Sequence, residues 1–307
     1  MPQAQTGIFV EGATSSEYIE FDVAPGSLTS LSQLLPLFEA EQDDVGVNFV
    51  VGVRPSLMKE ISPKHTPENV HDFADDVVGA DGYVIPATQR DLVFWVFGGA
   101  RDKVFDATRQ LLAIAREIVP GIRVVDETEG WVYQTNRDLT GFVDGTENPT
   151  TIEQYDEAVV ADGKPGEGSS VLLLQKWPHK QKAWESLSTE EQEGVIGRTK
   201  VDSVELEDKP ETSHAERTDQ DDFGHIVRRN MPYGDVSSHG TMFVGFACEQ
   251  KRLHDMLESM AGVGDYPRDA LTKYSNAETG SYYVIPRWTR SRADAPPPRM
   301  PSGRSQL

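Results

Sequence analysis

Hydrophobic and polar positions divide the chain into two halves with the same order of predicted elements. In the first half, alternating or continuous apolar runs predict strands, and apolar residues at helical spacing predict helices. The strand patterns cover 18–23, 47–53, 91–97 and 122–125, and the helical patterns cover 28–38 and 104–118. The order strand–helix–strand, twice over, is that of a ferredoxin-like domain. We place this N-terminal domain at residues 1–135.

The second half repeats that order. The strand patterns cover 170–175, 226–230, 241–246 and 281–285, and the helical patterns cover 184–196 and 253–260. Ser188 followed by Glu191 forms a capping-box pattern and predicts a helix N-cap, and the strand that begins at Ile226 is expected to end at Pro232. We therefore predict an α+β fold: two ferredoxin-like domains forming a duplicated α+β barrel, with antiparallel sheets flanked by helices. The C-terminal domain covers residues 169–292.

Three segments show no periodic pattern. Residues 55–72 are polar and contain prolines, and we predict a loop there. A connector at 136–168 is rich in Gly, Pro, Asp and Thr, and a connector of this length is usually functional or disordered. The tail at 293–307 is rich in Pro, Arg and Ser, and we expect it to be flexible.

Charge and cysteine content narrow the class of protein. The 307 residues include 50 acidic and 29 basic side chains, a formal net charge of −21. So acidic a surface repels nucleic acid and anionic membranes, so we exclude both as partners. Cys248 is the only cysteine, which excludes an intrachain disulfide and a thiolate metal site. Neither a secretory signal nor a run of about 20 apolar residues is evident, so we predict a cytoplasmic protein.

The connector holds the segment with the most unusual composition. Gly141–Pro149 packs two glycines, two acids, an asparagine and a proline into nine residues. Asp144 followed by Gly145 predicts a tight turn that directs the carboxylate outward. For that pair alone, a surface hairpin with a solvated aspartate is the favoured explanation. The seven histidines show no spacing typical of a zinc site, and residue patterns do not choose a haem ligand among them.

The complete segment resembles the GxxDG signature of the dye-decolorizing peroxidases, which bind haem b. The resemblance implies a haem peroxidase that uses hydrogen peroxide to oxidise dyes, phenolics or other organic reductants by one-electron steps. It also implies that His214, within 210–217, is the proximal ligand of the haem iron. Asp269 then lies behind His214 and strengthens it as a ligand. Arg198 resembles a family arginine near a haem propionate, a role that a guanidinium suits.

The strand at 226–230 resembles the family's strand that carries the distal arginine. Strand alternation puts Arg228 and Asn230 on one face and turns Arg229 to the other, toward solvent or a propionate. The resemblance implies that Asp144, Arg228 and Asn230 lie above the haem. Asp144 would move a proton between the peroxide oxygens, and Arg228 would stabilise the charge that develops there.

Other expectations stay open at this stage. The hydrophilic run at 207–222 is typical of an exposed loop, so His214 reaches a haem only if the loop folds back over it. Trp177, Trp184 and Tyr233 are candidate surface relays for electrons, although packing is the favoured explanation for each. We expect a homo-oligomer, and the tail shows no evident encapsulation signal although association with an encapsulin stays open. The alternatives are a haem-handling protein with incidental peroxidase activity and a haem-free ferredoxin-like binding module.

Overall fold

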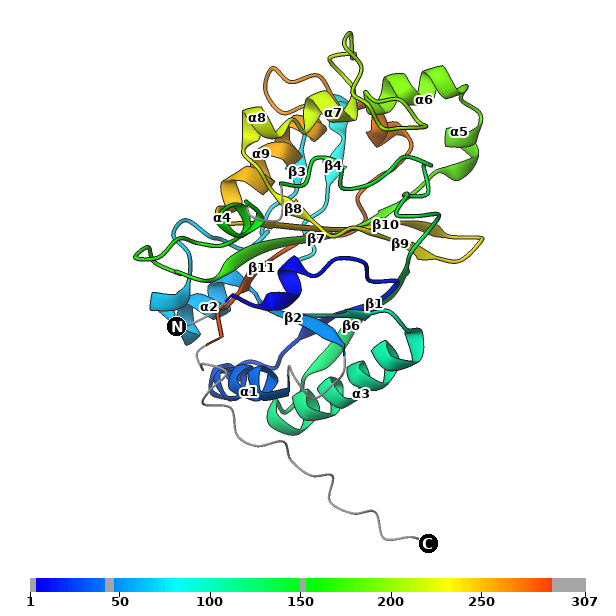
Figure 1. The fold of residues 1–307 in the computed structure, drawn as a ribbon. Coiled ribbons are helices and arrows are strands. Elements are labelled where there is room, and N and C mark those ends of the chain that lie inside the picture. The colour runs from blue at the N-terminus through cyan, green and yellow to red at the C-terminus, as the bar shows by residue number, and fades with distance from the viewer. Residues whose placement is uncertain (1–3, 42–46, 150–152, 289–307) are drawn as a thin grey trace, which may run out of the picture.

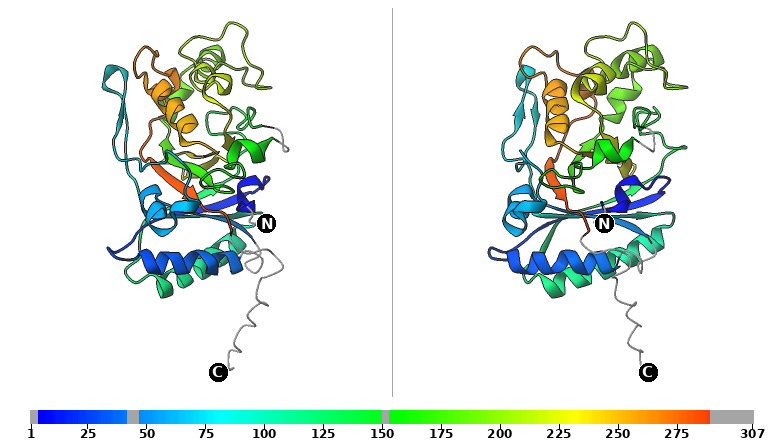
Figure 2. Two further views of the ribbon diagram at one scale, coloured as in Figure 1. Left: turned by 90° about the vertical axis from the view of Figure 1, so that its left-hand side faces the viewer. Right: turned by 60° about the vertical axis from the view of Figure 1, so that its left-hand side comes forward.

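The protein is a layered barrel, described here from a computed structural model that covers residues 4–41, 47–149 and 153–288. Helices α1 (Leu28–Glu41) and α3 (Arg101–Ile118) cover one side, one large curved sheet lies in the middle, and α5 to α9 lie on the other side (Figure 1). The side views show α9 (Gln250–Ala261) and the hairpin of β3 (Val77–Val78) and β4 (Val84–Ile85) on the face opposite α1 and α3 (Figure 2). No helix in these ranges is both long and apolar enough to cross a membrane.

Nine strands form a single sheet in the order β7-β11-β2-β5-β1-β6-β9-β10-β8, and an additional β7–β10 pairing closes it into a barrel. The strands are β1 (Ser15–Asp22), β2 (Asn48–Val53), β5 (Leu92–Gly98), β6 (Arg123–Trp131), β7 (Ser170–Pro178), β8 (Val227–Arg228), β9 (Met231–Gly234), β10 (His239–Ala247) and β11 (Ser281–Ile285). All their pairings are antiparallel. The two halves meet where β2 pairs with β11 and β6 pairs with β9. A separate hairpin joins β3 (Val77–Val78) and β4 (Val84–Ile85).

The long helices lie where the apolar periodicity predicted them. The α-helices are α1 (Leu28–Glu41), α2 (Pro55–Ile61), α3 (Arg101–Ile118), α4 (Gln154–Ala158), α5 (Gln181–Glu185), α6 (Thr189–Ile196), α7 (His214–Arg217), α8 (Gln220–Phe223) and α9 (Gln250–Ala261). Short 3-10 turns lie at Thr6–Phe9, Pro63–His65, Ala80–Gly82 and Ala270–Lys273. The predicted capping box at Ser188 and Glu191 is confirmed at the start of α6.

The hydrophobic core has three main parts. One lies between α1, α3 and the N-terminal half of the sheet, and a second fills the barrel. The third packs α9 against the C-terminal strands. Because α9 buries Leu253, Met256, Leu257 and Met260 toward the sheet, it forms one wall of the space in which the candidate site lies.

Several local predictions were wrong. Residues 55–72 are not all loop, because Pro55 occupies the first turn of α2, where its missing N–H costs nothing. The connector contains α4. The predicted helix at 184–196 is two helices, because Ser188 caps α6 and ends the run from α5.

The strand that starts near Ile226 does not end at Pro232. Asn230 divides it into β8 and β9, since its side-chain Oδ1 accepts the Val244 N–H (2.9 Å) in place of a backbone carbonyl. Pro232 then lies inside β9, opposite Thr241. The predicted tail at 293–307 lies outside the described residues.

Candidate active site

A deep cavity opens between the C-terminal strands and the helices above them. It measures ≈ 1410 Å³ when the solvent space of its open mouth is included. Its apolar wall comes from α9 and from Ile226 and Phe243 of the sheet. Five of the predicted site residues line it: Asp144, Arg198, His214, Arg228 and Asn230.

The segment Gly141–Pro149 turns Asp144 into the cavity and then fastens itself to β8. Gly145 has a φ of 78°, which favours glycine, and its turn brings Asn148 back toward the sheet. The Asn148 amide donates to the Arg228 carbonyl (3.0 Å) and accepts the Arg228 N–H (2.8 Å). This pair of bonds fixes Asp144 relative to the strand that carries Arg228.

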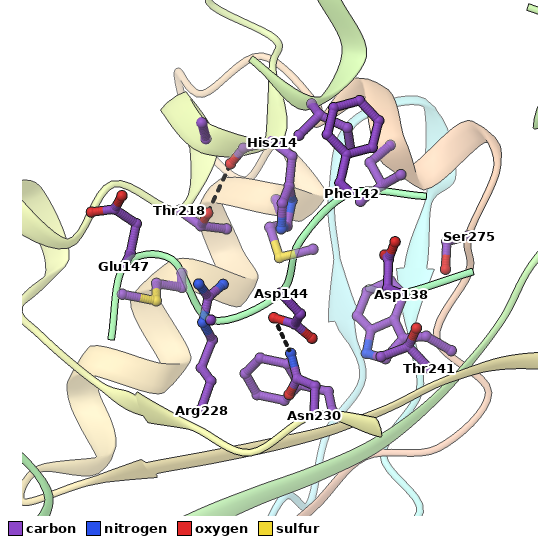
Figure 3. A pocket seen from close by; sticks show the side chains of 18 of the residues that line it. Asp138, Phe142, Asp144, Glu147, His214, Thr218, Arg228, Asn230, Thr241 and Ser275 are labelled. Atoms are coloured by element: carbon purple, nitrogen blue, oxygen red, sulfur yellow. Dashed lines mark hydrogen bonds between the residues drawn. The ribbon is translucent and has the colours of Figure 1, made fainter. Parts of the chain in front are cut away.

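Asp144, Arg228 and Asn230 form one polar group on the floor of the cavity (Figure 3). The Asn230 amide donates to Asp144 Oδ1 at 3.3 Å, so it orients the carboxylate. The Arg228 guanidinium has neither an ion pair nor a side-chain hydrogen bond in the described ranges, and its Nε is buried without a partner. A cation so placed is available to an anion or a polarised ligand in the cavity.

His214 lies across the cavity from this group (Figure 3). It is the first residue of α7, whose N-cap Ser213 is fully buried and accepts the Glu216 N–H. The His214 Nδ1 lies 2.7 Å from Asp269 Oδ2, and Asp269 is 0 % exposed. Because the other carboxylate oxygen already accepts the Leu271 N–H (2.8 Å), the pair is rigid. A carboxylate at Nδ1 fixes the proton there and leaves Nε2 as a free donor atom.

The predicted exposed loop at 207–222 folds back over the cavity. Arg217 and Gln220 are buried, and the Gln220 side chain bridges the Glu147 carbonyl (2.8 Å) and the Ile226 N–H (2.8 Å). The segment is hydrophilic because these polar side chains bind other parts of the site, and this brings His214 to the cavity.

Two predicted arginines have different surroundings. Arg198 lines the cavity, but its guanidinium is paired with Glu147 (2.5 Å) and Glu205 (2.9 Å). Arg229 does not line the cavity, and its predicted role at the cofactor stays a prediction. Alternation in β8 turns it away, as predicted, but toward Gln154 (2.8 Å) and Glu11 (3.4 Å) rather than to open solvent.

Some residues of the site were not predicted from the sequence. Asp138 lines the cavity beside Asp144, and burial raises its pKa to about 6. His179 bonds Ser275 (2.9 Å) and Thr241 (3.0 Å), and burial lowers its pKa to about 4, so it is neutral near pH 7. No sequence pattern identifies Asp138, because a hairpin between it and Asp144 brings it to the cavity.

The candidate electron relays do not lie at the surface. Trp177, Trp184 and Tyr233 are all buried, and the Trp184 indole donates to the Thr140 carbonyl (3.0 Å). Trp177 lines the cavity and Trp184 packs in a small apolar cluster with Phe142. None of the three is a surface residue, so the alternative that each of them packs is confirmed.

Comparison with known proteins identifies the class to which this fold and cavity belong. Residues 135–290 match the family described as "Dyp-type peroxidase, C-terminal". The dye-decolorizing peroxidase of Mycolicibacterium paratuberculosis is 37% identical over 76% of this chain and 66% of its own length. That of Mycobacterium tuberculosis is 34% identical over 89% of this chain and 82% of its own length.

Solved structures agree. A putative dyp-type peroxidase from Shewanella oneidensis superposes with a TM-score of 0.84, at 30% identity, over 94% of this chain and 97% of that one. A variant of DypB from Rhodococcus jostii, solved in complex with heme, gives a TM-score of 0.84 at 31% identity, over 93% of this chain and 97% of that one. The chain therefore belongs to the dye-decolorizing peroxidase family. This confirms the predicted fold class and the predicted class of enzyme, a haem peroxidase.

Proposed function

We propose that this peroxidase holds haem b in the cavity with His214 as the iron ligand, and that Asp144, Arg228 and Asn230 act on hydrogen peroxide at the opposite face. The observation that carries the proposal is the His214–Asp269 pair facing an unpaired Arg228 across one cavity. Dyes, phenolics or other small organic reductants would then be oxidised in one-electron steps.

The residues present fit such a cofactor. His214 Nε2 has no protein hydrogen-bond partner in the described ranges, and it faces the cavity. Leu253, Met256, Leu257 and Met260 offer an apolar wall suited to a flat aromatic macrocycle. Arg198 lies at the cavity, where its fork could bind a carboxylate in exchange for Glu147. The structure of the Rhodococcus jostii variant in complex with heme supports the same assignment.

When bound, haem supplies the iron at which peroxide binds and the oxidising power that the reductants consume. Asp144, when ionised, takes the proton from one peroxide oxygen and returns it to the other, which becomes water. Asn230 holds Asp144 in position through its amide. Arg228 carries a permanent positive charge and stabilises the negative charge that develops as the O–O bond breaks.

Reductants must approach from the mouth of the cavity. Glu147, Glu205 and Asp219 line the cavity there, with Arg198 between the two glutamates. This acidic edge favours neutral or cationic reductants over anionic ones. A cytoplasmic location and a homo-oligomeric state stay predictions from the sequence.

Replacement of two histidines tests the ligand assignment. His214→Ala should fold but lose haem and its Soret absorbance, because the proposed iron ligand that Asp269 supports is then missing. His225→Ala is the matched control, since His225 is exposed and does not line the cavity. Loss of haem in the His225 variant alone would overturn the assignment. A parent protein whose haem spectrum does not respond to peroxide would favour the haem-handling alternative.

A further inference from the structure

Asp138 and Asp144 lie on the two arms of one hairpin. Arg137 and Val143 form an antiparallel bridge, and the Asp144 N–H donates to the Asn136 carbonyl (3.0 Å). Both arms of this hairpin reach the cavity, and its lining includes Asp138, Thr140, Phe142, Val143 and Asp144. The hairpin therefore brings the carboxylates of Asp138 and Asp144 into the same cavity, although the two would lie far apart in a helix or in a single extended strand.

Arg137 holds this hairpin in place. It points away from the cavity, where its guanidinium donates to the carbonyls of Gly141 (2.7 Å), Lys200 (2.8 Å) and Val201 (2.8 Å). Each bond is charge-assisted, so the hairpin is pinned to the loop after α6. The relative placement of Asp138 and Asp144 is thus a fixed property of the site.

The Asp138 carboxylate has one satisfied oxygen. Its Oδ1 accepts both the Thr140 N–H (3.0 Å) and the Thr140 hydroxyl (2.5 Å). Its Oδ2 has no hydrogen-bond partner among the contacts of the described residues, and the side chain is half-buried at the cavity wall. Figure 3 shows the carboxylate near Asp144 and on the Thr241 and Ser275 side of the cavity. This oxygen is therefore where a proton can be held and exchanged with the cavity.

Burial is the main reason that the pKa of Asp138 is raised to about 6, and the charge of Asp144 raises it further while the Thr140 bonds oppose the rise. The other titratable or charged side chains that line the cavity are His179 from the end of β7, Arg198 and Glu205 from the loop after α6, His214 from α7, Asp219 before α8, Arg228 from β8 and Glu147. Lys200 lies over the Phe142 ring and bonds Gln192. Of these charged groups, Asp144 is the one whose charge raises the pKa of Asp138.

We propose that Asp138 is the proton store for the reductive half of the catalytic cycle and delivers its proton through Asp144. This rests on the proposed peroxidase function. Asp144 returns its proton within the peroxide step, so it ends that step ionised again. Converting one peroxide to two waters consumes two electrons and two protons, and the reductants supply both. Arg228 cannot release a proton and Asn230 does not titrate, whereas Asp138 can hold one beside Asp144.

The proton balance is closed. Once for each of the two electrons, the O–H bond of neutral Asp138 breaks, its proton passes across the cavity to the Asp144 carboxylate, and Asp144 gives it to the oxygen that leaves as water after the second transfer. Each phenolic reductant that loses an electron also releases a proton, which reprotonates the Asp138 carboxylate. Asp138 acts on the reaction through Asp144. Its loss should therefore change how the rate of reduction depends on pH, and should not abolish the reaction.

The test follows the two halves of the cycle separately in the haem-loaded enzyme. Peroxide is mixed first, a phenol is added second, and haem absorbance is recorded between pH 4 and 8, a range that brackets roughly the carboxylate titrations. In the parent, the rate of the second step should fall as pH rises through about 6. Asp138→Asn keeps the acceptor for Thr140 but cannot titrate, so this fall should vanish and the rate below pH 6 should drop on the order of 100-fold.

Thr140→Val separates a proton role from a structural one. It removes the hydroxyl that stabilises ionised Asp138, so the fall should move to higher pH by about one unit. An infrared titration of the parent minus that of Asp138→Asn should show a protonated-carboxyl band that disappears near pH 6, because the signals of other carboxyls such as Glu17 cancel in the difference. Asp106→Asn, an exposed change on α3, is the control that should alter none of these.

Each outcome decides between the two proposals. If the parent does not react with peroxide, the proposed function fails. If the parent reacts but Asp138→Asn keeps the parental pH profile, only the proton store is overturned. If Asp138→Asn does not bind haem, two other results can overturn the proton store. One is a pH profile of Thr140→Val that equals that of the parent, and the other is the lack of a carboxyl band in the parent that titrates near pH 6.

Discussion

Replacing Asp269 by Asn perturbs the His214 ligand without touching the cavity. In the parent, Asp269 Oδ2 faces His214 Nδ1 (2.7 Å) and Oδ1 accepts the Leu271 N–H (2.8 Å). An asparagine of the same shape has only one acceptor oxygen. If that oxygen keeps the Leu271 bond, the amide NH₂ meets the Nδ1–H of His214 and two donors face each other. If the amide flips, the buried Leu271 N–H loses its partner, at a cost of about 1–3 kcal/mol.

Either result weakens His214 as a donor to iron. Changes behind a metal-bound histidine typically cost about 10- to 100-fold in metal affinity or activity. For a one-electron couple that range corresponds to about 60–120 mV. The potential should rise, because the negative charge of Asp269 favours the more oxidised iron. We therefore expect Asp269→Asn to retain the fold and to show a haem potential about 60–120 mV above that of the parent.

Spectroelectrochemical titration of the haem-loaded proteins measures this shift. Asp255→Asn is the matched control, because Asp255 lies on α9 and pairs with Lys251 at the surface, away from His214. Its potential should equal that of the parent. The reasoning would be refuted if the two variants shared one potential while both retained haem, since Asp269 would then not act on the ligand.

Two further predictions concern the cavity floor and the barrel. Arg228→Leu should slow the peroxide step by on the order of 100- to 1000-fold at every pH, because the charge of Arg228 does not titrate. Asp144→Asn should instead flatten the acid limb of the pH–rate profile. Stopped-flow haem absorbance distinguishes the two variants, and parental rates in both would exclude this face of the cavity as the site of reaction. In the barrel, burial raises the pKa of Glu17 to about 7. The neutral form therefore stabilises the fold below the unfolded-state pKa of 4.5, and this contribution is lost as pH rises through about 7. Denaturant titrations at several pH values should show the free energy of unfolding of Glu17→Gln rising relative to that of the parent by up to about 3 kcal/mol over that pH range. A difference that does not depend on pH would contradict the raised pKa of Glu17.

The fold was predictable because its long elements carry strong patterns. The leucine spacing in α1 and the apolar face of α3 each predict a helix. The continuous apolar run of β5 predicts a strand that is buried on both faces, as the structure shows. What the pattern did not reveal is how the two halves join. Pairing of β2 with β11 and of β6 with β9 depends on long-range register, which no local period specifies. Short elements such as α2 and α4 have too few turns to produce a periodic signal.

The site was predictable only in part. Alternation correctly put Ile226, Arg228 and Asn230 on the cavity face, because strand geometry leaves two directions. His214 could not be found by pattern, since its segment is hydrophilic and its burial comes from contacts with distant residues. Asp138 was missed for a related reason. Its pairing with Asp144 depends on a hairpin that is built by turn residues and by Arg137, and not by hydrophobic alternation.

Asn148 explains why the recognisable segment extends past Asp144. A carboxylate that moves protons needs a fixed position relative to the cation that works with it, and a misplacement of about 1 Å costs roughly 100-fold in rate. Asp144 lies in an irregular segment, whereas Arg228 belongs to a sheet. Their registration comes from Asn148, whose amide replaces a neighbouring strand by satisfying both backbone groups of Arg228. The segment Gly141–Pro149 thus supplies both the reactive carboxylate of Asp144 and the Asn148 amide that aligns it with Arg228. The geometry of the strand that carries Arg228 therefore constrains the residues at both positions.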